Sequence, residues 1–247
     1  MSIPTTERER REIEFWRDSP DESPESDSVR IVIDKMQDAG ILLTCIQRHE
    51  EAFRRSERVL ELGAGQGWAS CLIKRQYPEA EVIATDISPY AVASVPKWER
   101  LFNTRIDGAY ACRSYEIAED DASLDCVFCF AAAHHFSAHR RTLQEIHRVL
   151  RPHGRCYYFY EPSCRRYLHT AAHRRVNRKR PDVPEDVLIF PKIRSLAAEA
   201  GLSCEFDFFP STAKRGAVET LYFYTLGRLP ILQQLLPCTI NYCFIKQ

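Results

Sequence analysis

The stretch Val59-Leu-Glu-Leu-Gly-Ala-Gly-Gln-Gly67 connects a short apolar run to the beginning of a helical pattern. Gly63, Gly65 and Gly67 let the backbone of this turn approach a ligand closely, because glycine has no Cβ. The helix predicted over residues 68–76 begins with backbone N–H groups that can bind a polar ligand. The spacing is G-x-G-x-G, whereas the nicotinamide-cofactor fingerprint needs glycine where this chain has Trp68. The stretch therefore predicts a ligand-binding turn between a strand and a helix.

Asp86 follows the next apolar run, residues 82–85, about 20 residues beyond the glycine turn. A carboxylate at a strand end can accept hydrogen bonds from both hydroxyls of a ribose. The alternative role for Asp86 is the N-cap of the next helix, although Ser88 could fill that role equally well. The pairing of the glycine turn with an acid at this distance is more informative than either feature alone.

Around this stretch, apolar runs alternate with helical patterns, which is typical of βαβ units and a parallel sheet. The sequence therefore predicts an α/β fold with a doubly wound, mostly parallel, seven-stranded sheet. The predicted strands are residues 59–62, 82–85, 108–112, 124–130, 156–160, 205–209 and 239–245. The predicted helices of this part are residues 68–76, 89–100, 138–150 and 191–200.

The N-terminal part differs in composition from the rest of the chain. Residues 1–27 are polar, and we expect a mobile or loosely docked arm there, with a short helix over residues 7–16. Residues 28–54 have apolar side chains at helical spacing and predict one or two amphipathic helices. We therefore divide the chain into N-terminal helices, residues 1–56, and a ligand-binding domain, residues 57–247.

These motifs resemble those of the class I S-adenosylmethionine-dependent methyltransferases, over residues 58–160. Residues 61–67 resemble the cofactor loop of that family, and Asp86 resembles its ribose-binding acid. Ala133-His-His-Phe136 resembles the branch that acts on small molecules and lipids. The resemblance implies a Rossmann-like fold, S-adenosylmethionine as the cofactor, and methyl transfer by in-line displacement to a small-molecule, sugar-linked or lipid-linked acceptor, at oxygen or carbon.

The resemblance also implies a set of cofactor-binding residues. After its third strand the family usually has Gly-Asp, whose acid binds the adenine amino group, but this chain has Ala111-Cys-Arg-Ser-Tyr115 there. Backbone groups near Arg113 and Ser114, or the carboxylate of Glu116, remain the alternatives for adenine. The expected cofactor-binding residues are Glu61, Gly63, Ala64, Gly65, Gly67, Asp86, Ile87, Glu116 and Ala131.

His134, His135 and Glu161 are the candidate catalytic residues. Each follows an apolar strand, and parallel strands present their carboxyl ends to one shared crevice. A histidine there can accept a proton from an attacking hydroxyl or amine. The alternatives are that one histidine only packs, and that Glu161 is a capping or solvated carboxylate.

Residues 164–180 carry a run of arginines and lysines without any acid. Such a run is often a solvated surface. The functional alternative is a basic, lid-like segment, residues 162–190, that binds an anionic acceptor through Arg165, Arg174, Arg175 and Arg178. His169 and His173 have a spacing that could bind zinc, but Thr170 stands where the zinc-protease motif has glutamate, so we expect no metal site.

A second apolar segment, residues 211–237, precedes the last strand and predicts a helical insertion. It either packs on the domain or offers an apolar surface to a lipid-like acceptor or a partner subunit. The longest apolar run, residues 126–133, is too short to span a bilayer, so we expect peripheral membrane contact at most.

Composition limits the remaining possibilities. Lys and Arg number 34, and so do Asp and Glu, so dominant binding to nucleic acid is not indicated. An RNA methyltransferase that uses residues 165–180 and a non-catalytic cofactor-binding regulator remain the alternatives. No secretory signal is visible, which favours a cytoplasmic protein in which the ten cysteines are reduced. Cys126 and Cys129 should point to opposite faces of their strand and so share no metal.

Overall fold

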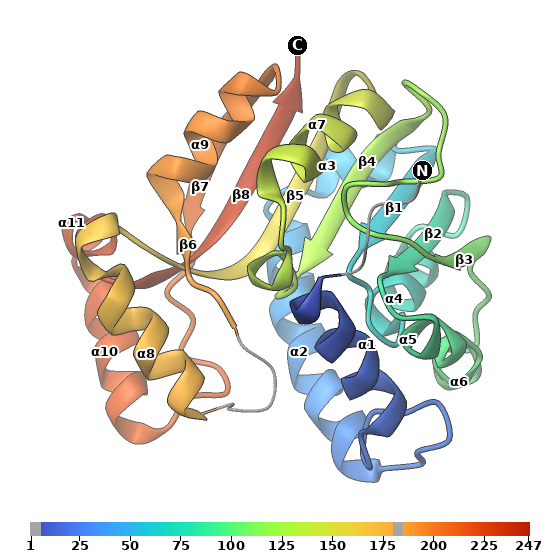
Figure 1. Cartoon of the computed structure of the whole chain (residues 1–247), viewed down its shortest axis with the longest axis horizontal. Coiled ribbons are helices and arrows are strands. Elements are labelled where there is room, and N and C mark those ends of the chain that lie inside the picture. Colours follow the sequence, from blue (N-terminus) through green and yellow to red (C-terminus); the bar gives the residue numbers. More distant parts are fainter. Residues whose placement is uncertain (1–5, 180–184) are drawn as a thin grey trace.

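A single sheet forms the centre of the protein (Figure 1). The computed structural model describes residues 6–179 and 185–247. The strand order is β3-β2-β1-β4-β5-β8-β7, and the short β6 pairs with β5. The strands are β1 (Arg58–Leu62), β2 (Glu81–Asp86), β3 (Gly108–Ala111), β4 (Leu124–Phe130), β5 (Leu150–Cys164), β6 (Leu188–Ile189), β7 (Leu202–Phe208) and β8 (Cys238–Lys246). β8 runs antiparallel to its neighbours, β5 and β7, and the other described strand pairs are parallel. The prediction of seven strands in a mostly parallel sheet is confirmed, and β6 is an addition to it.

Helices cover both faces of the sheet, as the doubly wound prediction requires. The helices are α1 (Glu7–Asp18), α2 (Val29–Gln47), α3 (Glu50–Arg55), α4 (Trp68–Gln76), α5 (Pro89–Ala93), α6 (Val95–Phe102), α7 (His139–Val149), α8 (His169–Lys179), α9 (Phe190–Glu199), α10 (Ala217–Arg228) and α11 (Pro230–Gln233). Two short 3-10 turns, η1 (Ala133–His135) and η2 (Arg166–Leu168), follow β4 and β5. Apolar side chains of α2, α3, α4 and α6 form one buried cluster with the sheet. Those of α7 and α9 form a second cluster on the other face.

Alternation along β4 divides its side chains between these two clusters. Cys126 belongs to the first cluster and Cys129 to the second, so they point to opposite faces as predicted. All ten cysteines are free thiols, and eight of them are buried. They act here as small core side chains.

The helix predicted over residues 89–100 is wrong in one respect. It is two helices, α5 and α6, with Ser94 between them. Pro96 lies in the first turn of α6. Because proline has no backbone N–H, it cannot donate the hydrogen bond that a continuous helix would need there.

The expectation of a mobile or loosely docked N-terminal arm is also wrong for the described residues 6–27. Thr6 and Glu9 form a capping box that starts α1. Glu9 is only 5% exposed, and it accepts hydrogen bonds from the hydroxyls of Tyr115 (2.6 Å) and Ser137 (3.1 Å). The polar side chains that suggested disorder are therefore the ones that fix the helix to the domain.

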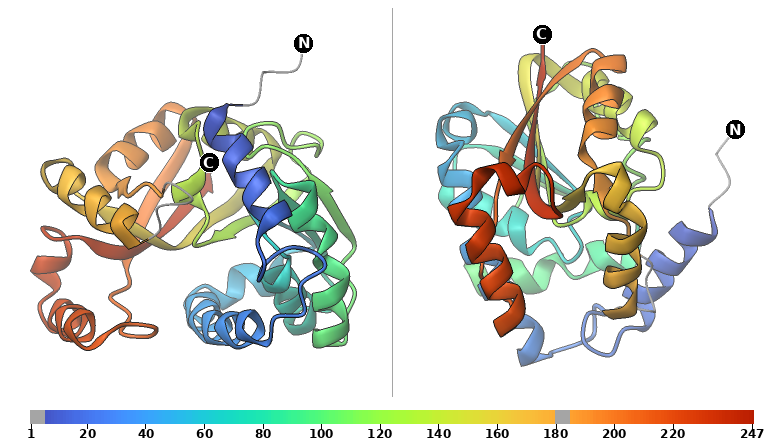
Figure 2. Two further views of the ribbon diagram at one scale, coloured as in Figure 1. Left: turned by 60° about the horizontal axis from the view of Figure 1, so that its bottom comes forward. Right: turned by 90° about the vertical axis from the view of Figure 1, so that its left-hand side faces the viewer.

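The segment after β5 and the segment before β8 both contain helices. The basic segment after β5 forms α8, and the predicted insertion before the last strand forms α10 and α11. Figures 1 and 2 show α8 and α10 together on one side of the molecule, and α1 and α2 on the other. Among the described residues, no helix has the length and apolar character needed to cross a bilayer.

Candidate active site

A cavity of about 780 Å³ opens at the carboxyl ends of the central parallel strands. Leu62, Asp86, Phe130 and Tyr160, which lie at or near the ends of β1, β2, β4 and β5, line it. Side chains of α1 and α2 form one wall, and side chains of α8 and α10 form another. Crevices at this edge of a doubly wound sheet are the usual place for ligands.

The glycine turn forms part of the cavity floor. Gly63, Ala64 and Gly65 line the cavity, whereas Gly67 does not. Gly67 has φ +78°, and a Cβ there would lie 2.6 Å from Cγ2 of Val95 in α6. The first glycines are thus placed to approach a ligand, and Gly67 allows α4 and α6 to pack closely.

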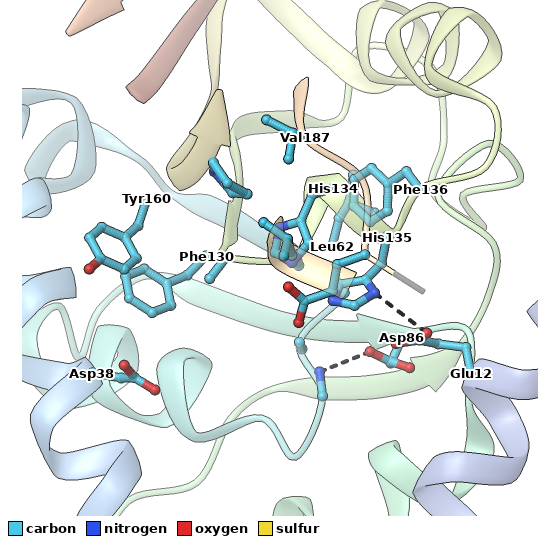
Figure 3. A pocket seen from close by; sticks show the side chains of 18 of the residues that line it. Glu12, Asp38, Leu62, Asp86, Phe130, His134, His135, Phe136, Tyr160 and Val187 are labelled. Atoms are coloured by element: carbon cyan, nitrogen blue, oxygen red, sulfur yellow. Dashed lines mark hydrogen bonds and ion pairs between the residues drawn. The ribbon is translucent and has the colours of Figure 1, made fainter. Parts of the chain in front are cut away.

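Asp86 connects the turn to the end of β2. Its carboxylate, labelled in Figure 3, accepts hydrogen bonds from the backbone N–H groups of Gly65 (2.9 Å) and Ser88 (2.8 Å). Burial raises the pKa of Asp86 to about 6, although these two N–H groups oppose the rise. The cap of α5 is the side chain of Ser88, so Asp86, which lines the cavity, keeps acceptor capacity beyond these two hydrogen bonds.

Glu61 is a buried acid beneath the same turn. It is 2% exposed and accepts a hydrogen bond from the hydroxyl of Ser70. Burial raises the pKa of Glu61 to about 8, and the nearby charge of Asp86 contributes to the rise. A cationic group bound beside Glu61 would favour its ionised form.

The two alternatives for binding adenine, backbone groups near Arg113 and Ser114 or the carboxylate of Glu116, differ in their position relative to the cavity. Arg113 and Ser114 line the cavity, and Glu116 does not. The Glu116 carboxylate accepts a hydrogen bond from Arg113 at 2.8 Å. Of the other expected cofactor residues, Ile87 and Ala131 both line the cavity.

His134 and Glu161 form a buried pair at the cavity wall. Nδ1 of His134 lies 2.8 Å from Oε2 of Glu161, and Glu161 also accepts hydrogen bonds from the backbone N–H groups of Ala132 (2.9 Å) and Ala133 (2.8 Å). Burial alone would raise the pKa of Glu161, but His134 and these N–H groups outweigh it and hold the pKa below its usual value. Since an ionised Glu161 can only accept, Nδ1 carries a proton, and in the neutral imidazole Nε2 is then the nitrogen with the free lone pair.

Only one member of this pair reaches the cavity. His134 lines it, whereas Glu161 is fully buried and lies outside the lining. Glu161 therefore touches a ligand only through His134. Arg8 of α1 donates a hydrogen bond to the backbone oxygen of His134 at 2.6 Å, which connects the N-terminal helix to the same site.

His135 faces α1 instead. Its Nδ1 lies 3.5 Å from a carboxylate oxygen of Glu12 (Figure 3). Burial alone would lower the pKa of His135, but Glu12 outweighs it and raises the pKa. Ligand atoms of His134, His135 and Glu185 lie within 4.8 Å of one another, so these three residues could hold a divalent metal. The prediction of no metal site is not tested by this geometry.

The basic residues predicted to bind the acceptor do not converge. Arg175 lines the cavity, but its guanidinium is paired with Glu219 at 2.9 Å. Arg165 lies outside the lining and donates to the backbone oxygen of Gln234. Arg174 and Arg178 lie on the exposed surface of α8 and also outside the lining.

Sequence reasoning missed two groups of residues that line the cavity. The first group belongs to α1 and consists of Arg8, Glu9, Glu12, Phe15 and Trp16. The capping-box pattern Thr6-x-x-Glu9 predicts a helix start but not where the helix docks. The second group is Lys214 and Arg215, in the segment before α10, for which no sequence pattern gives a signal.

The fold is the Rossmann-like α/β fold of the class I methyltransferases. A putative sarcosine dimethylglycine methyltransferase from Galdieria sulphuraria has a similar structure, with a TM-score of 0.62 at 17% identity, over 98% of this chain and 99% of that one. Geranyl diphosphate C-methyltransferase from Streptomyces coelicolor A3(2), solved with Mg²⁺, geranyl diphosphate and S-adenosylhomocysteine, has a TM-score of 0.57 at 12% identity, over 77% of this chain and 71% of that one.

Residues 60–158 match the family described as the methyltransferase domain. This segment is therefore similar to methyltransferase domains, which supports S-adenosylmethionine as the cofactor. An uncharacterised methyltransferase-like protein of Schizosaccharomyces pombe is 35% identical over 97 residues, which are 39% of this chain and 35% of that protein. A malonyl-[acyl-carrier protein] O-methyltransferase of Gallionella capsiferriformans is 26% identical over 125 residues, which are 46% of this chain and 41% of that protein. The chain thus spans less than half the length of these relatives.

Proposed function

We propose that this protein transfers the methyl group of S-adenosylmethionine to a small-molecule acceptor held in the cavity. The observation that carries the proposal is His134, whose Nδ1 is held by buried Glu161 while its side chain lines the cavity beside the cofactor turn. That arrangement leaves Nε2 as a proton acceptor.

In the proposed reaction the acceptor atom attacks the sulfonium methyl in line with the sulfur. The carbon–sulfur bond breaks, and its electron pair stays on sulfur as S-adenosylhomocysteine leaves. When the nucleophile is a hydroxyl, its proton passes to Nε2 of His134, and Glu161 stabilises the imidazolium that forms. Holding nucleophile and methyl in line can supply up to about 7–11 kcal/mol of the barrier. A general base worth about 10²- to 10⁴-fold supplies about 3–5 kcal/mol, so the cavity walls can contribute more than the base.

S-adenosylhomocysteine binding is the first test of the proposal. Calorimetric titration should give saturable 1:1 binding, and Asp86→Asn should weaken it. A folded wild-type protein that binds neither S-adenosylmethionine nor S-adenosylhomocysteine would contradict the proposal.

Transfer of a radiolabelled methyl group is the second test. Pools of hydroxy acids, carboxylic acids and neutral alcohols should be incubated with labelled cofactor, and the label should appear in a small product. Label appearing instead in added total RNA, with RNA binding that weakens steeply with salt, would favour the RNA alternative. Cofactor binding without label transfer to any class would favour the non-catalytic alternative.

A further inference from the structure

Most cations around the cavity already have acidic partners. The ammonium group of Lys214 lies 2.8 Å from carboxylate oxygens of both Asp34 and Asp38. The guanidinium of Arg175 is paired with Glu219 at 2.9 Å. The charges of these groups are therefore largely neutralised within the protein, and they offer little net charge to a ligand.

Arg215, next to Lys214, is different. Its Nη2 donates to two neutral groups, the hydroxyls of Tyr160 and Thr239, each at 3.2 Å. Its Nε is buried and has no hydrogen-bond partner among the residues that the structure describes. Within the described parts of the chain, no carboxylate lies at ion-pair distance from this guanidinium. A partly buried charge in this position is costly unless a counterion reaches it.

Aromatic rings hold the guanidinium in place. Its Cζ lies 4.0 Å from the ring centroid of Phe223 in α10 and 5.8 Å from that of Tyr160. Tyr160 in turn stacks on Phe130 at the end of β4, with ring centroids 5.8 Å apart. Because the rings fix the plane of the guanidinium, its unused N–H groups have a defined direction.

The position of Arg215 suits an acceptor rather than the cofactor. Arg215 lines the same cavity as His134. Its partner Tyr160 lies at the end of the cavity opposite Asp86 and Glu12 (Figure 3). An anion bound there would lie away from the expected ribose site.

We propose that Arg215 binds an anionic group of the methyl acceptor, a carboxylate or a phosphate, through its planar guanidinium. Both anions match the fork of N–H donors that arginine presents. This proposal rests on the proposed function and moves the anion site from the basic run of α8 to the segment before α10. It makes Arg215 a residue that selects acceptors by charge.

Binding of simple anions tests the proposal without knowledge of the natural acceptor. Malonate and inorganic phosphate are titrated into the protein saturated with S-adenosylhomocysteine, and malonamide serves as the neutral probe. The Nε–H resonance of Arg215 is followed by NMR, and affinities are measured by calorimetry. The variant is Arg215→Met, which keeps an apolar stem between the rings. The matched control is Arg228→Met, because Arg228 is an exposed arginine over Tyr224 in the same insertion, outside the cavity lining.

We expect at least one of the two anions to bind the wild type and to shift the Arg215 resonance, and malonamide to do neither. Arg215→Met should weaken that anion at least about tenfold, the size of one charge-assisted hydrogen bond, while Arg228→Met leaves it unchanged. The preferred anion identifies the source of the charge as a carboxylate or a phosphate.

Two results would overturn the proposal: an Arg215 resonance that neither anion moves, or equal anion affinity in the wild type and Arg215→Met. Because the NMR readout uses the wild-type protein, it decides the matter even if Arg215→Met fails to fold. Both variants should bind S-adenosylhomocysteine like the wild type, so loss of anion binding alone leaves the proposed function standing. Absence of S-adenosylhomocysteine binding in the wild type would instead contradict the proposed function.

Discussion

The carboxylate of Glu161 determines which nitrogen of His134 faces the cavity. Glu161→Gln would replace an acceptor with an amide whose NH₂ group can donate to Nδ1, which favours the other tautomer and removes the lone pair from Nε2. Turnover should fall about 10²- to 10⁴-fold, the range of a lost general base. S-adenosylhomocysteine affinity should stay within a few-fold, as measured by calorimetry.

His134→Ala provides the control for that prediction. It should lose turnover by a similar factor, and added imidazole should restore part of it, which a purely structural role would not allow. Normal turnover in well-folded His134→Ala would mean that the acceptor loses its proton elsewhere or needs no base.

The raised pKa of Asp86 predicts a pH dependence of cofactor affinity. In the proposed site the ionised carboxylate would accept hydrogen bonds from the ribose, and it becomes protonated as the pH falls through about 6. The dissociation constant of S-adenosylhomocysteine should therefore be about tenfold higher at pH 5 than at pH 7. Asp86→Asn should weaken binding at pH 7 by about 1.5–3 kcal/mol. It should also remove this dependence between pH 5 and 7. A wild-type affinity that is constant over this range would contradict the assignment of Asp86.

The position of some residues of the candidate site could be predicted from the sequence, and that of others could not. Gly65 and Asp86 could be placed at the same edge of the sheet, because each lies at or shortly after the end of a strand and the carboxyl ends of parallel strands meet at one edge. Arg215 could not, because its surroundings come from Tyr160, Phe223 and Thr239, which lie on three separate elements. The basic run of α8 carried a stronger charge signal, yet its Arg175 is neutralised by Glu219.

Helix α1 shows the same limit for a whole element. The capping box predicts where the helix begins, but its docking depends on Tyr115, which is 106 residues from Glu9 in the sequence. The contact with Tyr115 is not visible in the sequence, so the polar composition of this helix alone predicts a loosely docked arm. The ring of Trp16 lies against Gly65, so this helix covers the cofactor turn.

Tyr115→Phe should loosen α1. It removes the hydroxyl that donates to the Glu9 carboxylate at 2.6 Å, a bond to a charged group that contributes about 1.5–3 kcal/mol. Amide hydrogen exchange over residues 7–18 should accelerate at least about tenfold. The matched control is Tyr110→Phe, which removes a 3.0 Å bond to Glu119 away from α1. Equal exchange of α1 in both variants would mean that Glu9 does not hold the helix in place.

For the molecule as a whole, the order of elements was predictable because strand–helix alternation permits few parallel arrangements. The exact boundaries of the helices and strands were not predictable. The α5–α6 boundary depends on Pro96, and the length of β5 depends on its pairing with β8 through residue 163. The structure also shows which buried polar groups in the two clusters have hydrogen-bond partners, and the sequence does not.

Tyr158 and Tyr242, on neighbouring strands, differ in whether their buried hydroxyls have a hydrogen-bond partner. They are register partners in β5 and β8, and both are fully buried. The hydroxyl of Tyr242 lies 2.7 Å from Oγ of Ser163, whereas that of Tyr158 has no hydrogen-bond partner within residues 6–179 and 185–247. A buried hydroxyl without a partner costs about 1–3 kcal/mol, and a satisfied one contributes about 1 kcal/mol.

Tyr158→Phe should therefore raise the free energy of unfolding by about 1 kcal/mol or more, and Tyr242→Phe should lower it by about 1 kcal/mol. In a chain of this size, 1 kcal/mol corresponds to a change in thermal midpoint of about 2–4 °C. Urea unfolding measures both variants, and S-adenosylhomocysteine affinity should be unchanged in each because neither ring lines the cavity. A destabilising Tyr158→Phe would contradict this prediction and would mean that the hydroxyl stabilises the fold through a buried water or through its packing contacts.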